Sequence, residues 1–154
     1  MLFRSIKKVN PEKAQLSFIC SDLSDLSIYA KAIDNSLFRI MKKLLPGPYT
    51  FILPASKEVP KILQSKKKTI GLRIPDNNIA LSIIKTLGHP ILSASFPGDN
   101  VEDYTDPEII YEHWGNQVDM VIDGGIGGIT PSTVIDCTTD EYTLIRQGAG
   151  TWEY

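Results

Sequence analysis

The sequence has no apolar run close to the roughly 20 residues that a membrane-spanning helix needs. It also has little excess charge, because 16 Lys and Arg face 18 Asp and Glu for a net charge of -2, so recognition of anions must be local. With two cysteines, two histidines and no Cys-x-x-Cys pair, it offers little for a protein-held metal site. The cysteines lie in apolar segments, as is usual in a reducing compartment. We therefore expect a cytoplasmic protein with no metal of its own and no membrane association.

Strand-like and helix-like segments alternate along a chain of 154 residues, the length of one domain. The alternation predicts an α/β fold with an open, twisted, mixed sheet and flanking helices. Asp22 or Ser24, Asp34, and Asp76 or Asn77 are the expected caps of three helices. Strands are expected at residues 16–20, 49–53, 69–75, 91–96, 118–122 and 142–146. Helices are expected at residues 22–31, 34–45, 56–63, 77–87 and 106–114, with an irregular loop at 97–105.

An arginine stands inside the apolar strand at residues 69–75. On a strand, Ile70, Leu72 and Ile74 share one face. Arg73 therefore lies on the other face beside Gly71, where we expect no side chain to block a ligand. Because an unpaired buried charge costs several kcal/mol, such an arginine needs a carboxylate or an anionic ligand. The alternative is an arginine at a strand end that extends to water.

Three further elements end in residues suited to an anion. Ser93 and Ser95 share a strand face and can donate hydrogen bonds, although buried serines often bond neighbouring backbone instead. Ser132 and Thr133 follow a loop rich in glycine, whose backbone amides can approach a ligand. Arg146 is a second arginine at a strand end. Together with Arg73, these elements predict a site for a ligand that carries phosphate.

Positive charge also gathers at Lys7 and in the run Lys66, Lys67 and Lys68, either as a binding surface or as solvated faces. We predict that these lysines and Ser93 bind substrate or RNA. Acids near the expected site can hold Mg²⁺ through bound phosphates or form salt bridges, and they are Asp119, Asp123 and Asp136. Neither histidine has a nucleophile in an activating context, so the residues alone identify no catalytic group.

The order of five motifs carries more information than any one of them. Together they resemble the YrdC/YciO family, and its YciO branch in particular, from about residue 6 to the C-terminus. The motifs are Pro46-Gly47-Pro48-Tyr49-Thr50, Gly71-Leu72-Arg73-Ile74-Pro75, Ser93-Ala94-Ser95, Ser132-Thr133-Val134-Ile135-Asp136 and Ile145-Arg146-Gln147-Gly148-Ala149-Gly150. The resemblance implies a YrdC/RibB-like sheet with a concave, positive surface.

The family's best-understood members join L-threonine, bicarbonate and ATP into threonylcarbamoyl-AMP for tRNA modification, with release of pyrophosphate. Several relatives bind double-stranded RNA. The resemblance therefore implies ATP or AMP with Mg²⁺ bound through its phosphates, L-threonine, and double-stranded RNA or tRNA as partners. It places Arg73 at a phosphate or the threonine carboxylate, Ser132 and Thr133 at the nucleotide, and Arg146 at a phosphate. Ser95 corresponds to the serine of the family's Ser-x-Asn motif.

Three departures from the family pattern keep a second function open. One cation of a Lys-x-Arg pair is replaced by Ser5, Phe96 and Pro97 stand where an asparagine is expected, and the opening Pro-Thr-Asp segment has no counterpart. We expect one domain over residues 1–154, incomplete at its N-terminus relative to the family, with an exposed edge that a homo-oligomer would cover. The alternatives are a synthase-like enzyme, a non-catalytic nucleotide- or double-stranded-RNA-binding module, and a fragment with no independent function.

Overall fold

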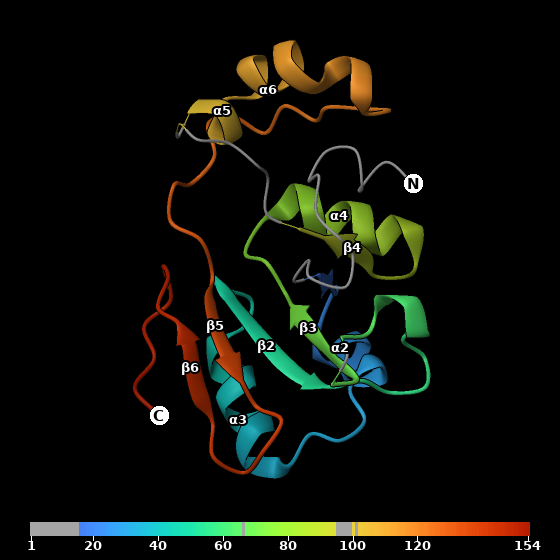
Figure 1. Cartoon of the computed structure of the whole chain (residues 1–154), viewed down its shortest axis with the longest axis vertical. Helices are drawn as coiled ribbons and strands as arrows, with labels where there is room; N and C mark the ends of the chain where they lie inside the picture. The colour runs from blue at the N-terminus through green and yellow to red at the C-terminus, as the bar shows by residue number, and fades with distance from the viewer. Residues whose placement is uncertain (1–15, 66, 95–99, 101) are drawn as a thin grey trace. The chain divides into compact units, whose positions relative to one another are not determined.

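The structure is a computed structural model that describes residues 16–65, 67–94, 100 and 102–154 (Figure 1). Lys7, Lys66 and Ser95, all named above, lie outside these residues. Contacts divide the chain into two compact units. One comprises residues 15–94 and 131–154 and is called the sheet unit below, and the other comprises residues 1–14 and 95–130 and is called the helical unit.

The sheet unit contains a six-stranded sheet in the order β4-β1-β3-β2-β5-β6. Two pairs of strands, β1 with β3 and β2 with β5, are parallel, and the other neighbours are antiparallel. This arrangement confirms the predicted mixed, open α/β sheet. The strands are β1 (Ser17–Ile19), β2 (Tyr49–Pro54), β3 (Thr69–Arg73), β4 (Ile91–Ser93), β5 (Thr133–Asp136) and β6 (Thr143–Arg146).

Three capped helices belong to the same unit, and their caps confirm the sequence prediction. The carboxylate of Asp22 accepts from the first turn of α2 (Leu23–Tyr29), and that of Asp34 accepts from two amides of α3 (Asn35–Leu44). Asn77 caps α4 (Asn78–Leu87), which ends at Gly88 with a left-handed φ of 72°. A glycine adopts this conformation without the steric cost that a Cβ would bring.

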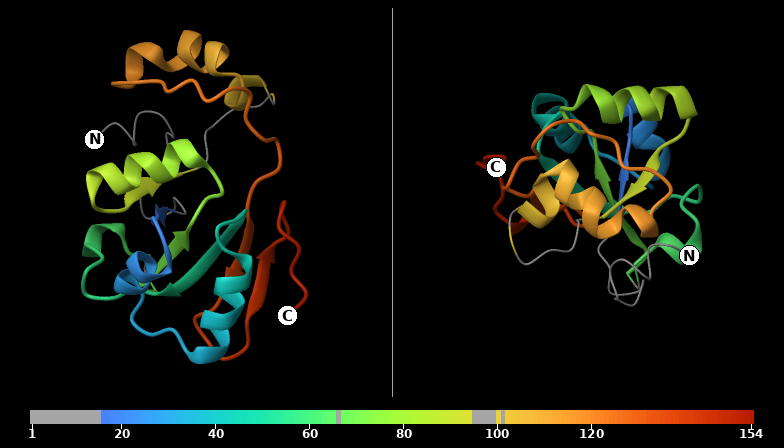
Figure 2. Two further views of the ribbon diagram at one scale, coloured as in Figure 1. Left: turned by 180° about the vertical axis from the view of Figure 1, so that it is seen from behind. Right: turned by 90° about the horizontal axis from the view of Figure 1, so that it is seen from above.

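The hydrophobic core lies between the sheet and these helices. Ile70, Leu72 and Ile74 are all buried, as the alternation in this segment predicts, and they join Phe51 of β2 and Ile135 of β5 in the core. The view from behind shows α3 across this face of the sheet (Figure 2). The core therefore occupies one sheet face, and the alternate residues of every strand point to the other.

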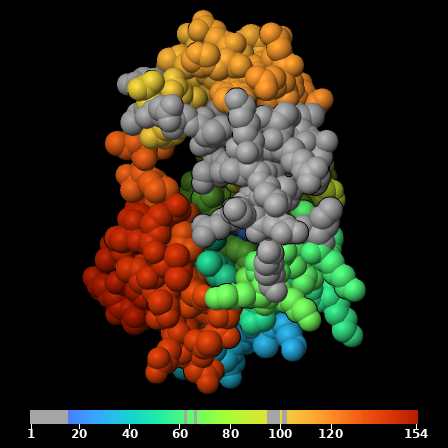
Figure 3. Space-filling view, in the orientation of Figure 1, coloured from blue at the N-terminus to red at the C-terminus, as the bar shows by residue number. Residues whose placement is uncertain are grey.

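The C-terminal residues after β6 contact side chains of β2. Figure 3 shows the C-terminal part of the chain, in red, at the left of the sheet unit. Tyr49 donates its hydroxyl hydrogen to the carbonyl of Thr151 at 2.9 Å. The ring of Trp152 meets that of Phe51 edge-on, with centroids 6.4 Å apart. These contacts fix the segment that follows Arg146.

The helical unit contains α5 (Glu102–Thr105), α6 (Pro107–Trp114) and the 3₁₀ turn η2 (Gly115–Gln117). Asp106 caps α6 as predicted, with Pro107 in its first turn. Two predictions are wrong here. Residues 102–105 are helical rather than irregular, and residues 118–122 form no strand. An apolar run becomes a strand only when a neighbouring strand accepts its hydrogen bonds, and none of the described strands pairs with it.

The predicted helix at residues 56–63 is also shorter than expected. Only η1 (Lys61–Leu63) is helical, as a single 3₁₀ turn that begins after Pro60. Proline has no amide hydrogen to donate, so it interrupts the backbone bonds of a helix that would include it. None of the helices in the described parts of the chain is long and apolar enough to cross a membrane.

Candidate anion-binding site

The sheet face opposite the core carries polar side chains on several strands. The register pairs Ser17 of β1 with Gly71 of β3 on one side and with Ser93 of β4 on the other. Phe51 pairs with Leu72 on the core face, so continuing that register by one residue places Thr50 beside Arg73 on the polar face. The strand pairing therefore agrees with the prediction that Arg73 points away from the core.

The Arg73 side chain is partly buried on the polar face of the sheet. Its Nε atom is inaccessible to solvent and has no hydrogen-bond partner in the described part of the chain. Burial, and then the positive charge of Arg146, lower the pKa of the Arg73 guanidinium, which nevertheless remains protonated in proteins. A buried donor without an acceptor and a like charge nearby are both unfavourable. Bound anionic oxygen would relieve both.

Arg146, whose charge acts on Arg73, contacts Ser132. The Nη2 and Nε atoms of Arg146 donate to the backbone carbonyl of Ser132 at 2.8 and 3.2 Å. Nη2 also lies 3.4 Å from the Ser132 hydroxyl oxygen, and that hydroxyl is 2.9 Å from the hydroxyl of Thr50. Two predicted residues, Ser132 and Arg146, are thus brought together. Thr50 joins them, and its signal in the sequence was a polar residue on the non-core side of an apolar strand.

Gly71 has a different role from the expected one. A Cβ atom there would lie 3.1 Å from Cβ of Ser17, 3.2 Å from Cγ2 of Thr50 and 3.3 Å from the carbonyl of Leu16. The neighbouring strands therefore fill the space above this glycine. The prediction that Gly71 leaves an open approach to Arg73 is wrong, because the missing side chain is needed for close packing across the sheet.

Thr133 lies on the core side of β5 and is fully buried. Its hydroxyl donates to the carbonyl of Gly150 and accepts from the amide of Gly148 at 2.9 Å. A Cβ at Gly148 would collide with the backbone of Pro131 and Ser132. The hydroxyl of Thr133 thus holds the turn after Arg146 against the loop that carries Ser132.

Ser93 has local partners in the sheet. Its hydroxyl oxygen is 2.9 Å from that of Ser17 and donates at 3.3 Å to the Ser17 carbonyl. This is the arrangement expected for a buried serine that bonds the neighbouring strand. The pair lies on the polar face, but Ser17 is one strand and Ser93 two strands further from the strand of Arg146 than Arg73 is.

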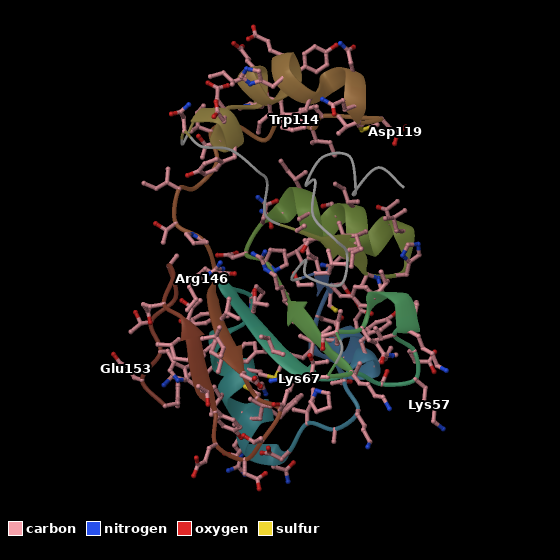
Figure 4. All side chains as sticks on the ribbon, viewed as in Figure 1. Lys57, Lys67, Trp114, Asp119, Arg146 and Glu153 are labelled. Carbon is pink, nitrogen blue, oxygen red and sulfur yellow. The ribbon has the colours of Figure 1, made fainter. Side chains whose placement is uncertain are left out.

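The lysine run lies at the other end of the sheet. Lys67 and Lys68 precede β3, whereas Arg73 ends it, a separation of about 16 Å along the strand. Figure 4 shows Lys57 and Lys67 at the end opposite Arg146. Lys68 holds a left-handed φ of 57°, a conformation that is costly for a residue with a Cβ. The structure therefore separates Lys67 and Lys68 from the arginine pair.

The predicted acids do not form a metal centre. Asp119 and Asp123 belong to the helical unit, and a carboxylate oxygen of Asp136 accepts from the amide of Thr138 at 2.9 Å. Within the described ranges there is no group of three or more His, Cys, Asp or Glu side chains suited to a metal ion.

The structure is an α/β fold whose polar sheet face carries Arg73 and, on β6, Arg146. A family model described as telomere recombination, for Sua5, YciO and YrdC proteins, matches residues 3–148. The chain belongs to this Sua5/YciO/YrdC family. The predicted membership is confirmed.

Escherichia coli YciO, an uncharacterized protein, is 46% identical over 143 residues, which cover 91% of this chain and 68% of YciO. A crystal structure of E. coli YciO matches with a TM-score of 0.87 over 97% of this chain and 73% of that one. This likeness confirms the predicted YrdC-type sheet and the YciO branch.

More distant relatives have a stated activity or ligand. A threonylcarbamoyl-AMP synthase of Pyrococcus abyssi is 30% identical over 92% of this chain and 42% of its own length. The crystal structure of P. abyssi Sua5 complexed with L-threonine has a TM-score of 0.81 at 29% identity, covering 95% of this chain and 43% of that one. The chain is therefore related to threonylcarbamoyl-AMP synthases.

Proposed function

We propose that this chain binds the phosphate groups of ATP or AMP at Arg73 and Arg146, as part of a threonylcarbamoyl-AMP synthase-like function in tRNA modification. The observation that carries the proposal is the buried Nε of Arg73, which has no hydrogen-bond partner among the described residues and lies near a second positive charge. Both features are unfavourable for the fold of the sheet alone. A phosphate oxygen would accept the free hydrogen and offset the repulsion.

The reaction needs positioning and cancellation of charge more than covalent help from the protein. Bicarbonate and the amine of L-threonine must be brought to the nucleotide as pyrophosphate leaves, and preorganised cations lower the cost of that charge build-up. Arg73 would face a phosphate or the threonine carboxylate, Ser132 and Arg146 would hold the phosphate, and Thr133 would hold the turn behind them. Mg²⁺ would come with the phosphates. Ser95 stays a predicted nucleotide-binding residue.

Calorimetric titration with AMP, ATP and L-threonine tests this proposal, together with pyrophosphate release in the presence of bicarbonate. We expect AMP to bind the unaltered chain and to bind Arg73→Ala at least 10-fold more weakly, since hydrogen bonds to charged groups contribute about 1.5–3 kcal/mol. Arg39→Ala, which removes an exposed arginine on α3, is the matched control and should bind normally.

The outcomes separate the alternatives. Nucleotide binding with pyrophosphate release supports the synthase-like enzyme. Binding of nucleotide without turnover supports the non-catalytic module, to which Ser5, Phe96 and Pro97 point. Absence of nucleotide binding by the unaltered chain overturns the proposal.

A second candidate is RNA binding by a lysine surface, defined as the exposed residues Lys31, Lys57, Lys61, Lys67 and Lys68. Two backbone hydrogen bonds hold Lys31 and Lys68 at the end of β2. The amide of Lys31 donates to the carbonyl of Pro54 at 2.8 Å, and the amide of Ala55 donates to the carbonyl of Lys68 at 2.9 Å. Residues 55–69 contain five lysines and one glutamate in a chain of net charge -2. Such a surface suits a phosphate backbone.

Salt dependence tests this second function. Binding of a duplex RNA should weaken steeply as salt rises. Exchanging Lys57 and Lys67 for glutamine should reduce the slope of log affinity against log salt by about one for each phosphate that is no longer neutralised. RNA affinity that does not change in this double variant would exclude the lysine surface. Exchange of Lys42 and Lys43 on α3 is the control.

Two further proposals concern the cellular compartment and the oligomeric state of the protein. Cys20 and Cys137 are free, buried thiols, which supports a place in the reducing cytoplasm. The predicted single domain and homo-oligomer stay predictions, and sedimentation of the chain at several concentrations would test the oligomer.

A further inference from the structure

Thr50 is a polar residue in a strand whose alternate residues form the core. Thr50 is 9% exposed, and its side chain points to the polar face. It lies on β2, between β3, which carries Arg73, and β5, which Ser132 immediately precedes. The hydroxyl oxygens of Thr50 and Ser132 are 2.9 Å apart. The strand itself does not require a hydroxyl at this position, because valine would fit a strand equally well. The fold of β2 therefore does not explain why residue 50 is a threonine.

Packing fixes which way the Thr50 hydroxyl faces. A Cβ on Gly71 would lie 3.2 Å from Cγ2 of Thr50, so the methyl group occupies the space above that glycine. A β-branched side chain has few χ1 options, and with its methyl group toward β3 its hydroxyl faces Ser132, which immediately precedes β5. Gly71 thus helps to set the orientation of Thr50.

The donors around Ser132 then constrain its hydrogen. Nη2 of Arg146 can only donate, and it lies 3.4 Å from the Ser132 hydroxyl oxygen. A hydroxyl has one hydrogen and two acceptor lone pairs. If Thr50 also donates to this oxygen, both lone pairs are used and the Ser132 hydrogen is free for an acceptor on the open side.

We propose that Thr50 is a positioning residue of the anion site. It donates its hydroxyl hydrogen to Ser132, and Ser132 consequently donates its own to a phosphate oxygen of the nucleotide. The inference rests on the proposed function, because it requires a phosphate at this site. Thr50 itself does not contact the ligand.

A double-mutant cycle read out by AMP titration tests the inference. Thr50→Val keeps the shape and removes the hydroxyl, and we expect AMP to bind about 3- to 10-fold more weakly, the effect of one lost hydrogen bond. Thr50→Ser should restore binding. In the Ser132→Ala background, Thr50→Val should have no further effect, since the two residues act as one unit. Thr143→Val, the same exchange at an exposed position of β6, is the control.

Each result decides between the proposals. AMP binding that is unchanged in Thr50→Val, or weakened equally with and without Ser132, overturns the positioning role while leaving the proposed function intact. If Thr50→Val does not fold, failure of Thr50→Ser to bind like the unaltered chain likewise overturns that role. If the unaltered chain binds no AMP, the proposed function and this inference both fail.

Discussion

The two ends of the sheet are both positively charged, but their charges are held in different ways. At one end, Arg73 is buried without a hydrogen-bond partner for Nε among the described residues, and Arg146 is fixed on the carbonyl of Ser132. At the other end, the lysine surface is exposed to water throughout. The first end resembles a preorganised site for one compact anion, and the second resembles a solvated surface for an extended one.

The comparison shows that the amount of positive charge does not identify a binding site by itself. Three consecutive lysines attract attention in the sequence, yet exposed lysines cost the fold little because water solvates them. A single buried guanidinium without an acceptor lowers stability, so its presence is a stronger sign of a ligand. A cost to the fold also distinguishes Lys68 from the other exposed lysines, because its backbone is left-handed.

Replacing Arg73 by Met should have the largest effect and separates binding from stability. We expect AMP affinity to fall by 10-fold or more, and the free energy of unfolding to rise by about 1–2 kcal/mol, because a buried cation near Arg146 is replaced by an apolar group. Titration and urea unfolding measure the two quantities. Arg39→Met should change neither, and a loss of stability in Arg73→Met would mean that Arg73 has a structural partner.

A substitution in the turn after Arg146 tests whether this end of the sheet is closely packed. Gly148→Ala places a Cβ against the backbone of Pro131 and Ser132, and such overpacking costs about 1–3 kcal/mol. Unfolding by urea should show this loss together with weaker AMP binding. Gly128→Ala is the matched control, since a Cβ there would meet nothing within 4 Å. Equal stability of the two variants would contradict the close packing of the turn.

Lys68→Gly examines the opposite end in the same way. The left-handed φ of 57° is unstrained for glycine, so we expect the free energy of unfolding to rise by about 0.5–1 kcal/mol. If the lysine surface binds RNA, the salt slope should fall in the same variant. Lys67→Gly, at a residue without positive φ, should not be stabilised, and a loss of stability in Lys68→Gly would refute the strain.

The charged carboxylate of Asp34, unlike Arg73 Nε, has hydrogen-bond partners among the described residues, and we expect its replacement to have the smallest effect on stability. Hydrogen bonds from the amides of Leu37 and Ser36 and from the hydroxyl of Tyr142 lower its pKa. Because the folded pKa is the lower one, the stabilisation is complete above the unfolded value of about 3.9 and is lost as pH falls through the folded value.

The Asp34 prediction is checked with urea midpoints at pH 7 and pH 2.5. Asp34→Ala should unfold at lower urea than the unaltered chain at pH 7, and the difference should shrink at pH 2.5. Asp34→Asn keeps a side chain that caps helices and should lose only the pH dependence. A difference between Asp34→Ala and the unaltered chain that is independent of pH would contradict the charged cap.

Local patterns in the sequence predicted much of the fold. The caps Asp22, Asp34 and Asn77, the end of α4 at Gly88, and the core face of β3 follow from spacing and from side-chain chemistry within a few residues. The predictions for residues 56–63 and 118–122 were wrong because Pro60 or the lack of a pairing strand among the described strands outweighed the local apolar pattern. Residues 102–105, predicted to be irregular, form α5. A strand depends on a neighbour that the local sequence does not contain.

The sequence by itself determined that Arg73 lies off the core face and that Ser132 and Arg146 belong to a motif order typical of the Sua5/YciO/YrdC family. Only the tertiary structure decided that Arg73 is buried near Arg146, that Thr50 bonds Ser132, that Gly71 is filled rather than open, and that the lysines lie at the far end of the sheet. The physical reason is that side-chain alternation is a property of one strand. Burial, repulsion between charges and close packing arise between strands that are distant in the sequence.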